Sequence, residues 1–186
     1  MTMRIGSGEM RGRRLRAPRG ERTRPTSGRL KKSLFDVLAP RLEGARVLDL
    51  FSGSGSLALE ALSRGAATAV LVERGGKACE TIRRNVKELG LSRRAEVVER
   101  DVFSALGKLV HRGESFDVVF ADPPYRSSEP DKLLVFLGNE TLVAEGGLVV
   151  VEHHHKREFR DRYGALEKHR LLKAGESCLT LYQRDR

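Results

Sequence analysis

An acid, two prolines and an aromatic residue stand together after one apolar run and could do chemistry on an amine. The segment Asp122-Pro123-Pro124-Tyr125 follows residues 116–121, whose apolar character predicts a buried strand. Proline cannot donate to a sheet, so the strand ends here, and open α/β folds carry their chemistry just beyond the carboxyl ends of such strands. The segment therefore brings a carboxylate, a rigid carbonyl and an aromatic ring to one predicted site.

An exocyclic amine on a purine is a poor nucleophile because its lone pair is delocalised into the ring. Hydrogen bonds from the amine to Asp122 and the Pro123 carbonyl would hold the nitrogen nearly tetrahedral and stabilise its developing positive charge. Tyr125 would stack on a base extruded from its helix. The segment resembles the (Asp/Asn)-Pro-Pro-(Tyr/Phe) signature of methyltransferases that modify exocyclic amines of nucleobases. We predict that the catalytic residues are Asp122, Pro123, Pro124 and Tyr125.

A glycine loop follows an earlier apolar run, within residues 47–57. Gly53 and Gly55 allow backbone torsions and a close approach that a side chain would block. Such a loop is equally expected at a dinucleotide site, but the third glycine of the dinucleotide fingerprint is Ala58 here. Asp49, at the preceding strand end, would repel a pyrophosphate and attract a cationic group. A cationic ligand is therefore the better prediction.

This loop resembles motif I of class I S-adenosylmethionine methyltransferases, whose cofactor carries an ammonium and a sulfonium but no phosphate. Glu73 ends the second predicted strand, near the place where an acid binds ribose hydroxyls in nucleoside-binding α/β folds. The resemblance implies that Asp101, after the third strand, meets the adenine amino group. Phe51 is expected to be half core and half cofactor wall. The predicted cofactor-binding residues are Asp49, Phe51, Ser52, Gly53, Ser54, Gly55, Glu73, Asp101 and Val102.

Positive charge is concentrated at the amino terminus. The net charge is +10, of which residues 1–32 carry +9 and the other 154 residues +1. A cationic arm on a nearly neutral body predicts a polyanionic partner. Glycine and proline punctuate the arm, which favours a small hairpin presenting arginines over a solvated, disordered tail. The predicted RNA-binding residues are Arg4, Arg11, Arg13, Arg14, Arg16, Arg22, Arg24, Thr26, Lys31 and Lys32.

Strand and helix patterns alternate along the rest of the chain. Predicted strands cover residues 46–51, 69–73, 95–99, 116–121 and 147–152, and predicted helices lie near 57–62, 78–89, 102–110 and 132–137. This order predicts an α/β fold with right-handed βαβ units and a mostly parallel sheet covered on both faces. Residues 168–173 and 177–182 predict a closing antiparallel hairpin. A helix with Leu30, Leu34, Val37 and Leu38 on one face, capped by Thr26 or Ser27, would join arm and body.

Length and composition exclude several classes of protein. A chain of 186 residues suits one domain, and it has neither an apolar run of membrane-spanning length nor a signal-peptide core. We therefore expect a cytoplasmic protein without a membrane partner. Cys79 and Cys178 have no partner at metal spacing and are expected to be buried thiols. His153, His154 and His155 would point to alternate faces of a strand, so no metal site is predicted.

The amino-terminal segments Arg4-Ile5-Gly6, Arg11-Gly12-Arg13 and Arg24-Pro25-Thr26, with a helix containing Leu34-Phe35, resemble the opening of the RsmD family. These bacterial enzymes methylate the N2 amine of one guanine in small-subunit (16S) ribosomal RNA. The resemblance covers nearly the whole chain, and Glu9 departs from the basic character of the arm.

Several properties follow from that resemblance as expectations. It implies a seven-stranded class I, Rossmann-like methyltransferase domain over residues 28–186 and a basic, RNA-binding hairpin extension within residues 1–27. It implies S-adenosylmethionine as the methyl donor and S-adenosylhomocysteine as the product. It further implies a monomer that acts on small-subunit RNA within a 30S subunit or an assembly intermediate.

Three alternatives stay open at this point. An adenine-N6 or other amine methyltransferase acting on DNA or RNA would use the same arrangement, because the geometry at Asp122 does not name the base. Aspartate, where many adenine enzymes use asparagine, mildly favours guanine. A ribosome-assembly module could keep the fold and bind RNA without turnover. A nicotinamide oxidoreductase is disfavoured by Asp49 and by the lack of a set of residues suited to hydride transfer.

Overall fold

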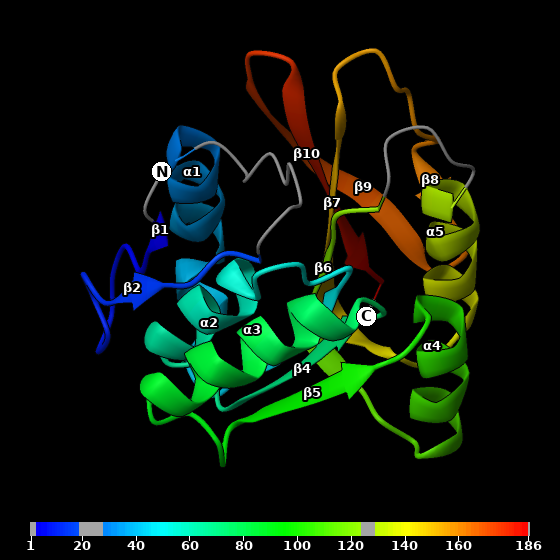
Figure 1. Cartoon of the computed structure of the whole chain (residues 1–186). Helices are drawn as coiled ribbons and strands as arrows, with labels where there is room; N and C mark the ends of the chain where they lie inside the picture. Colours follow the sequence, from blue (N-terminus) through cyan, green and yellow to red (C-terminus); the bar gives the residue numbers. More distant parts are fainter. Residues whose placement is uncertain (1–2, 19–27, 124–128, 186) are drawn as a thin grey trace.

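A twisted eight-stranded sheet forms the centre of the protein in the computed structural model (Figure 1). The structure describes residues 3–18, 28–123 and 129–185. The strands are β1 (Met3–Arg4), β2 (Arg14–Leu15), β3 (Arg46–Leu50), β4 (Thr68–Glu73), β5 (Ala95–Glu99), β6 (Phe116–Ala121), β7 (Val143–His154), β8 (Arg162–Tyr163), β9 (Leu166–Ala174) and β10 (Ser177–Arg184). The helices are α1 (Gly28–Leu38), α2 (Ser56–Ser63), α3 (Gly76–Glu88), α4 (Val102–His111) and α5 (Glu129–Asn139), with a 3₁₀ turn at Ala39–Arg41.

The order of strands in the main sheet is β5-β4-β3-β6-β7-β10-β9-β8. The first five are parallel, and β10, β9 and β8 join them in antiparallel pairs. The strand order reverses between β3 and β6, which lie side by side although 65 residues separate Leu50 from Phe116 by the numbering. Ligands of open α/β sheets bind beside such a reversal, beyond the carboxyl ends of the strands.

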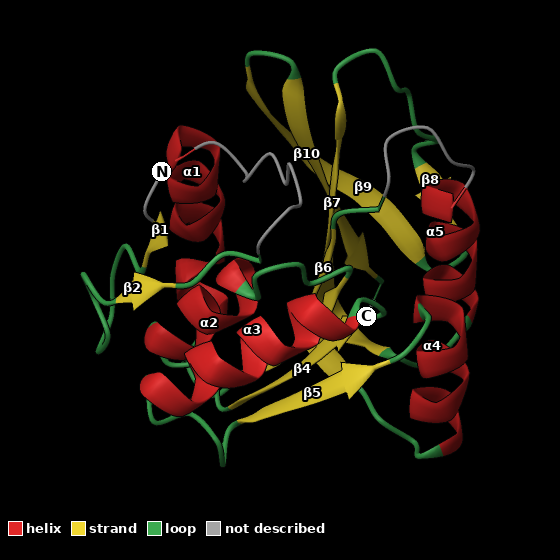
Figure 2. Cartoon of the chain, viewed as in Figure 1, coloured by secondary structure: helices red, strands yellow, loops and turns green. Residues whose placement is uncertain are grey.

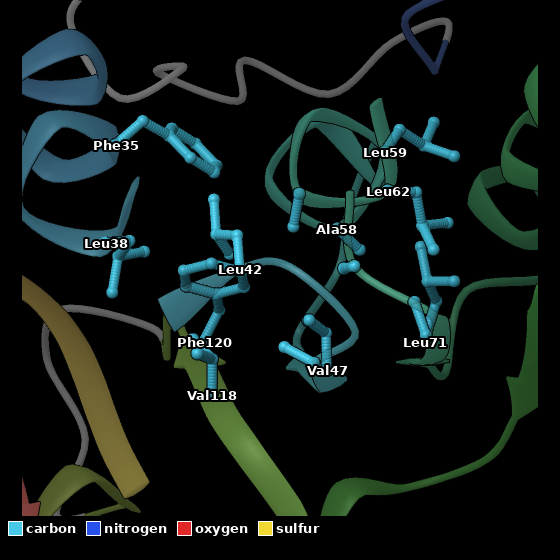
Figure 3. Close-up of a cluster of buried hydrophobic side chains, with 14 of the residues drawn as sticks. Phe35, Leu38, Leu42, Val47, Ala58, Leu59, Leu62, Leu71, Val118 and Phe120 are labelled. Carbon is cyan, nitrogen blue, oxygen red and sulfur yellow. The ribbon is translucent and has the colours of Figure 1, made fainter. Parts of the chain in front are cut away.

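Helices cover both faces of the sheet. Figure 2 shows α2 and α3 against one face and α4 and α5 against the other. Strand alternation divides the apolar residues between two cores: in β3, Val47 packs toward α1 and α2, whereas Leu48 and Leu50 pack toward α4 and α5. Figure 3 shows the first core, where Phe35 of α1 and Phe120 of β6 have ring centroids 6.1 Å apart. Burial of these side chains contributes roughly 1.5–3 kcal/mol for each large residue.

A separate two-stranded hairpin, β1 and β2, precedes α1. Its apolar side chains do not stand apart from the body, because Ile5, Met10 and Leu15 are buried in the core beneath α1 and α2. The hairpin predicted for the arm is confirmed. The division of the chain at residue 27 stays a prediction, and residues 19–27, including the proposed caps Thr26 and Ser27, lie outside the described residues.

The predicted α/β architecture is confirmed, with differences at its edge. The predicted strands 95–99 and 116–121 coincide with β5 and β6. The main sheet has eight strands instead of seven, because the two-residue strand β8 pairs with the start of β9. Such a short strand carries no alternation that sequence could reveal. Cys79 and Cys178 are buried free thiols, as predicted. No helix in the described ranges has the length and apolar character needed to cross a membrane.

Candidate functional site

The loop between β3 and α2 has unusual backbone torsions. Phe51, Gly53 and Gly55 have positive φ angles of 60°, 55° and 73°, a region that residues other than glycine seldom occupy. Ser52 ties the loop to the sheet, since its hydroxyl lies 2.6 Å from the carbonyl oxygen of Asp49 and 3.2 Å from a carbonyl oxygen of β4. A strained backbone held in this way is typical of a ligand-binding loop.

The two glycines of this loop face different surroundings. A Cβ on Gly55 would lie 2.9 Å from the Leu71 side chain, so this glycine lets the loop pack closely against β4. A Cβ on Gly53 would meet no atom of the described chain within 4 Å. The space beside Gly53 is open, which is what a cofactor lying against the loop backbone requires.

Four acids gather at the edge where the parallel strands end. Asp49 and Glu73 lie in β3 and β4, Asp122 directly follows β6, and Glu152 lies near the end of β7. The residues two positions before them all pack in the core beneath α1 and α2: Val47, Leu71, Phe120 and Val150. Because side chains alternate along a strand, the four acids project toward that same face. We call them the edge carboxylates.

Asp49 is a buried edge carboxylate that has other acids nearby. Within the described chain its carboxylate accepts one hydrogen bond, from the N–H of Ala58 at 3.3 Å. The pKa of Asp49 is raised to about 8, chiefly by burial and to a smaller extent by the negative charges of Asp122 and Glu73. The hydrogen bond from Ala58 and the positive charge of Lys31 act in the opposite direction. A ligand cation placed at this edge would favour the ionised form.

Asp122 directly follows β6, which pairs with the strand that carries Asp49. Its N–H donates to the carbonyl of Leu50 at 3.4 Å, and the residue keeps an exposed surface. Desolvation by the surrounding protein atoms nevertheless raises the pKa of its carboxyl group to about 7, and the negative charge of Glu152 contributes to the increase. Pro123 is buried directly after it. The other two predicted catalytic residues, Pro124 and Tyr125, lie outside the described residues.

Glu73 joins the glycine loop to the next strand end. Its carboxylate accepts hydrogen bonds from the N–H of Gly53 at 3.0 Å and from the N–H of Gly75 at 2.8 Å. This acid therefore lies beside the open space at Gly53. Its contact with a cofactor ribose stays a prediction.

The remaining predicted cofactor residues are Phe51, Ser54, Asp101 and Val102, which the fold places in different surroundings. Phe51 is half-buried against the core beneath α4 and α5, which also contains the buried Val102. Asp101 is the N-cap of α4 and accepts a hydrogen bond from the N–H of Ser104 at 3.2 Å. Ser54 lies toward the amino-terminal hairpin, as described below.

The amino-terminal hairpin is held on α2 by a single buried carboxylate. Glu60 accepts hydrogen bonds from the N–H groups of Gly6 at 2.8 Å and Ser7 at 3.0 Å. It also pairs with Lys31 at 3.3 Å and with Arg64 at 2.9 Å. Burial opposes ionisation of Glu60, but these hydrogen bonds and cations outweigh it and lower the pKa of the carboxyl group. Glu60 is thus a fully partnered structural charge.

One turn further along α2, Ser63 makes a second set of contacts with the hairpin. Its hydroxyl accepts from the N–H of Met10 at 3.0 Å and donates to the carbonyl of Ser7 at 2.7 Å. A Cβ on Gly8 would lie 1.8 Å from the Ser63 carbonyl oxygen, so only glycine fits there. Glu9, the acid that departs from the basic pattern, pairs with Arg94 at 3.6 Å.

The arginines of the hairpin fall into two groups. Arg4 donates to the carbonyl of Gly12 at 2.8 Å, Arg13 donates to the carbonyl of Glu88 at 2.5 Å, and Arg16 pairs with the carboxylate of Glu88 at 2.7 Å. In contrast, Arg11 and Arg14 are exposed and make no side-chain hydrogen bond or ion pair within the described chain.

The other predicted RNA-binding residues are placed differently. Lys31 already has partners within the chain, because its ammonium group pairs with Glu60 and donates to the carbonyl of Ser56 at 3.1 Å. Lys32 is exposed on α1. Three further predicted residues lie outside the described residues: Arg22, Arg24 and Thr26.

Sequence reasoning missed several residues that the fold brings to these regions. Glu152 resembles Asp122 in following a run of apolar residues, and that signal could have revealed it. Arg84 of α3 lies near the same carboxylate as two hairpin arginines, since the positive charges of Arg16, Arg84 and Arg13 all lower the pKa of Glu88. No local pattern marks Arg84, because its neighbours come from a segment about 70 residues earlier.

The three consecutive histidines do not converge. His153 turns inward, where its Nε2 lies 2.8 Å from the Thr180 hydroxyl and its ring meets Phe159 edge-on at 4.9 Å. The rings of His154 and His155 lie 4.2 Å apart nearer the surface. Among the described residues, no cluster of three or more acids, histidines or cysteines could hold a metal ion.

Comparisons with known proteins agree with this geometry. The family model described as conserved hypothetical protein 95 matches residues 3–183. Ribosomal RNA small subunit methyltransferase D of Escherichia coli (strain K12) is 34% identical over 98% of this chain and 90% of its own length.

Solved structures are similar too. A candidate methyltransferase from Escherichia coli, yhhF, is 34% identical and superposes with a TM-score of 0.88, covering 100% of this chain and 99% of that one. An RNA methyltransferase from Salinibacter ruber, in complex with S-adenosyl-L-homocysteine, is 21% identical, with a TM-score of 0.67 over 87% of this chain and 94% of that one. At this identity the likeness shows a shared fold.

Proposed function

Because this chain belongs to the conserved hypothetical protein 95 family, together with ribosomal RNA small subunit methyltransferase D, we propose that it methylates the exocyclic N2 amine of a guanine in small-subunit ribosomal RNA. The observation that carries this proposal is the position of Asp122. It lies at the end of β6, beside the glycine loop and on the face shared by the edge carboxylates.

The methyl donor is S-adenosylmethionine, and the residues present fit it. Its sulfonium, when bound, supplies an electrophilic methyl group, and its positive groups complement an edge that holds Asp49, Glu73 and Asp122 close enough to influence one another. The open space beside Gly53 receives the ligand, and Glu73 lies where it can accept hydrogen bonds from ribose hydroxyls. A phosphate group would be repelled by the acids of this site.

Asp122 and the Pro123 carbonyl accept hydrogen bonds from the guanine amine. These acceptors hold the nitrogen lone pair in the direction of transfer and stabilise the positive charge that develops on nitrogen. A carboxyl group with a pKa of about 7 then takes up the proton that the cationic product amine releases, so no separate general base is needed. Stacking of Tyr125 on the extruded base completes the proposal and rests on the sequence alone.

The RNA backbone binds along the hairpin. Arg11 and Arg14 are exposed and unoccupied within the described chain, so they are the best available phosphate contacts. Arg13 and Arg16 contribute positive charge while they hold the hairpin to Glu88. We propose that the substrate is a 30S subunit or its assembly intermediate and that the enzyme acts as a cytoplasmic monomer.

The choice of guanine rests on the family and on the aspartate at position 122. An adenine-N6 or other amine methyltransferase would use the same acceptors, and a non-catalytic RNA-binding assembly factor would need the hairpin alone. The decisive experiment is transfer of a labelled methyl group to unmodified small ribosomal subunits, followed by mapping of the modified base. Labelled N2-methylguanine supports the proposal, methyladenine assigns the second activity, and RNA binding without any transfer assigns the third.

The variant Asp122→Ala tests the mechanism. We expect methyl transfer to fall about a thousandfold, because both acceptor and proton-accepting roles are lost, while affinity for S-adenosylhomocysteine changes by less than about threefold. Isothermal titration of the product provides the control for an intact cofactor site. Near-normal turnover in this variant would contradict the proposed role.

A further inference from the structure

Asn85, a buried amide in the middle of the third helix, joins two parts of the molecule that have separate tasks. Its Oδ1 accepts from the N–H of Arg16 at 2.9 Å, and its Nδ2 donates to the carbonyl of Arg16 at 3.1 Å. The same Nδ2 donates to the carbonyl of Ser54 at 3.3 Å. Arg16 directly follows β2 of the hairpin, and Ser54 lies between the two glycines of the cofactor loop.

The amide is fully engaged in this bridge. Asn85 is 1% exposed, and both its acceptor and its donors have partners. An asparagine at a buried position of an amphipathic helix is costly unless hydrogen bonds offset the loss of hydration. Its neighbours on the same face of α3, Ile82 and Val86, are apolar and serve the core. Asn85 therefore differs from them in holding two backbone segments together.

Among the described residues, hydrogen bonds connect the hairpin with the cofactor loop through Asn85 and at one other place. The Ser54 hydroxyl lies 3.7 Å from the sulfur of Met3, in β1. By contrast, Glu60 and Ser63 fix the hairpin to α2 through Gly6, Ser7 and Met10, and none of their hydrogen bonds reaches the loop. The chain thus offers two kinds of anchor for the same hairpin, of which one also holds the loop.

We propose that Asn85 is a positioning residue that couples the hairpin to the cofactor loop, so that binding of cofactor and binding of RNA strengthen each other. The inference rests on the proposed function, which assigns cofactor to the loop and RNA to the hairpin. A cofactor that orders the Ser54 carbonyl also orders Asn85 and, through it, the backbone at Arg16. RNA that holds the hairpin has the reciprocal effect, because coupling between two binding sites is mutual.

The test measures affinities instead of turnover. Binding of S-adenosylhomocysteine is measured by calorimetry with and without a small-subunit RNA fragment, and RNA binding is measured with and without S-adenosylhomocysteine. We expect each ligand to raise the affinity of wild-type protein for the other by about tenfold, within the usual range of such coupling. In Asn85→Ala this factor should fall to about one.

Ser63→Ala is the matched control, since it removes hairpin contacts without touching the loop. It should weaken RNA binding and keep the tenfold coupling factor. Equal loss of coupling in Ser63→Ala and Asn85→Ala would overturn the proposal, because it would show that any loosening of the hairpin has this effect. Unchanged coupling in Asn85→Ala would overturn it as well.

Amide hydrogen exchange in the wild-type protein gives an independent reading that no folding defect can obscure. Adding S-adenosylhomocysteine should slow exchange at the Arg16 amide, which donates to Asn85, and leave the Met10 amide, which donates to Ser63, unchanged. Equal responses would contradict the inference. Wild-type protein that binds both ligands independently and transfers methyl groups would refute only the coupling, whereas failure to bind S-adenosylhomocysteine would refute the proposed function.

Discussion

Asp49 and Glu60 are buried carboxylates on consecutive elements, and the fold treats them in opposite ways. Both are at most 4% exposed. Glu60 has two backbone N–H donors, a lysine and an arginine, and its pKa is lowered. Asp49 has one long hydrogen bond from a backbone N–H and other acids nearby, and its pKa is raised to about 8.

The difference separates structural charge from functional charge. A buried carboxylate with all its partners inside the chain stabilises the fold and offers nothing to a ligand. A buried carboxylate surrounded by other acids reduces stability and acquires a partner when a cation binds. Glu60 has its partners within the chain, whereas Asp49 has a single hydrogen bond and lies near other acids.

The variant Glu60→Ala should have the largest effect and tests whether the charge of Glu60 stabilises the fold. The substitution leaves Lys31 and two backbone N–H groups without their acceptor, and we expect the free energy of unfolding to fall by about 3–5 kcal/mol. Urea unfolding measures the change. Ser63→Ala, which removes two neutral hydrogen bonds at the same hairpin, should cost only about 1–3 kcal/mol. A smaller loss for Glu60→Ala than for Ser63→Ala would show that the charge is not structural.

Asp49→Asn should have the opposite effect on stability and a large effect on binding. We expect affinity for S-adenosylhomocysteine to fall about 10- to 100-fold, because a charge-assisted contact is lost. The folded pKa of about 8 exceeds the unfolded value of roughly 3.9. The folded state therefore binds more protons between these values, and wild-type stability falls as pH rises through that window.

Asparagine stays neutral, so the free Asp49→Asn variant should be more stable than wild type at pH 8.5. The difference should disappear below about pH 3, where the aspartate is protonated in both states. Thermal unfolding at the two pH values checks this sign. A variant that is less stable at pH 8.5 would mean that Asp49, like Glu60, is a structural charge.

A third test measures how affinity for S-adenosylhomocysteine depends on pH. Because cation binding requires ionised carboxylates, affinity for S-adenosylhomocysteine should rise with pH between 6 and 7.5, by up to about tenfold per unit for each proton released. Proton release should be visible as a buffer-dependent enthalpy in calorimetry. In Asp49→Asn the rise should be much shallower, because the carboxyl group with a pKa of about 8 has been removed. A flat wild-type profile would argue against a cation at this edge.

The smallest expected effect concerns the two groups of hairpin arginines. Replacing Arg11 and Arg14 with alanine should reduce the slope of log affinity for RNA against log salt by about 0.7–0.9 for each lost phosphate contact. These residues have no internal side-chain partner in the described chain, so thermal stability should not change. Replacing Arg16 removes the ion pair with Glu88 and should loosen the hairpin as well. An unchanged slope in the first variant would mean that the hairpin does not meet phosphates.

Much of the fold could be predicted because its signals are local. The runs that form β5 and β6 end at the residues expected from their apolar pattern, and the loop at Gly53 and Gly55 has the positive φ angles that glycine favours. Strand β8 and the early start of β7 at Val143 could not be foreseen, because pairing with a distant strand, and not local preference, decides them.

The sequence by itself determined which acids end the strands, and strand alternation then placed them on one face. It also determined that the positive charge lies at the amino terminus. Only the tertiary structure decided which charged side chains have hydrogen-bond or ion-pair partners, because the partners of a buried group come from far along the chain. Gly6 reaches Glu60 across 54 residues and Arg16 reaches Asn85 across 69, so no short window of sequence shows which buried polar groups have partners within the chain.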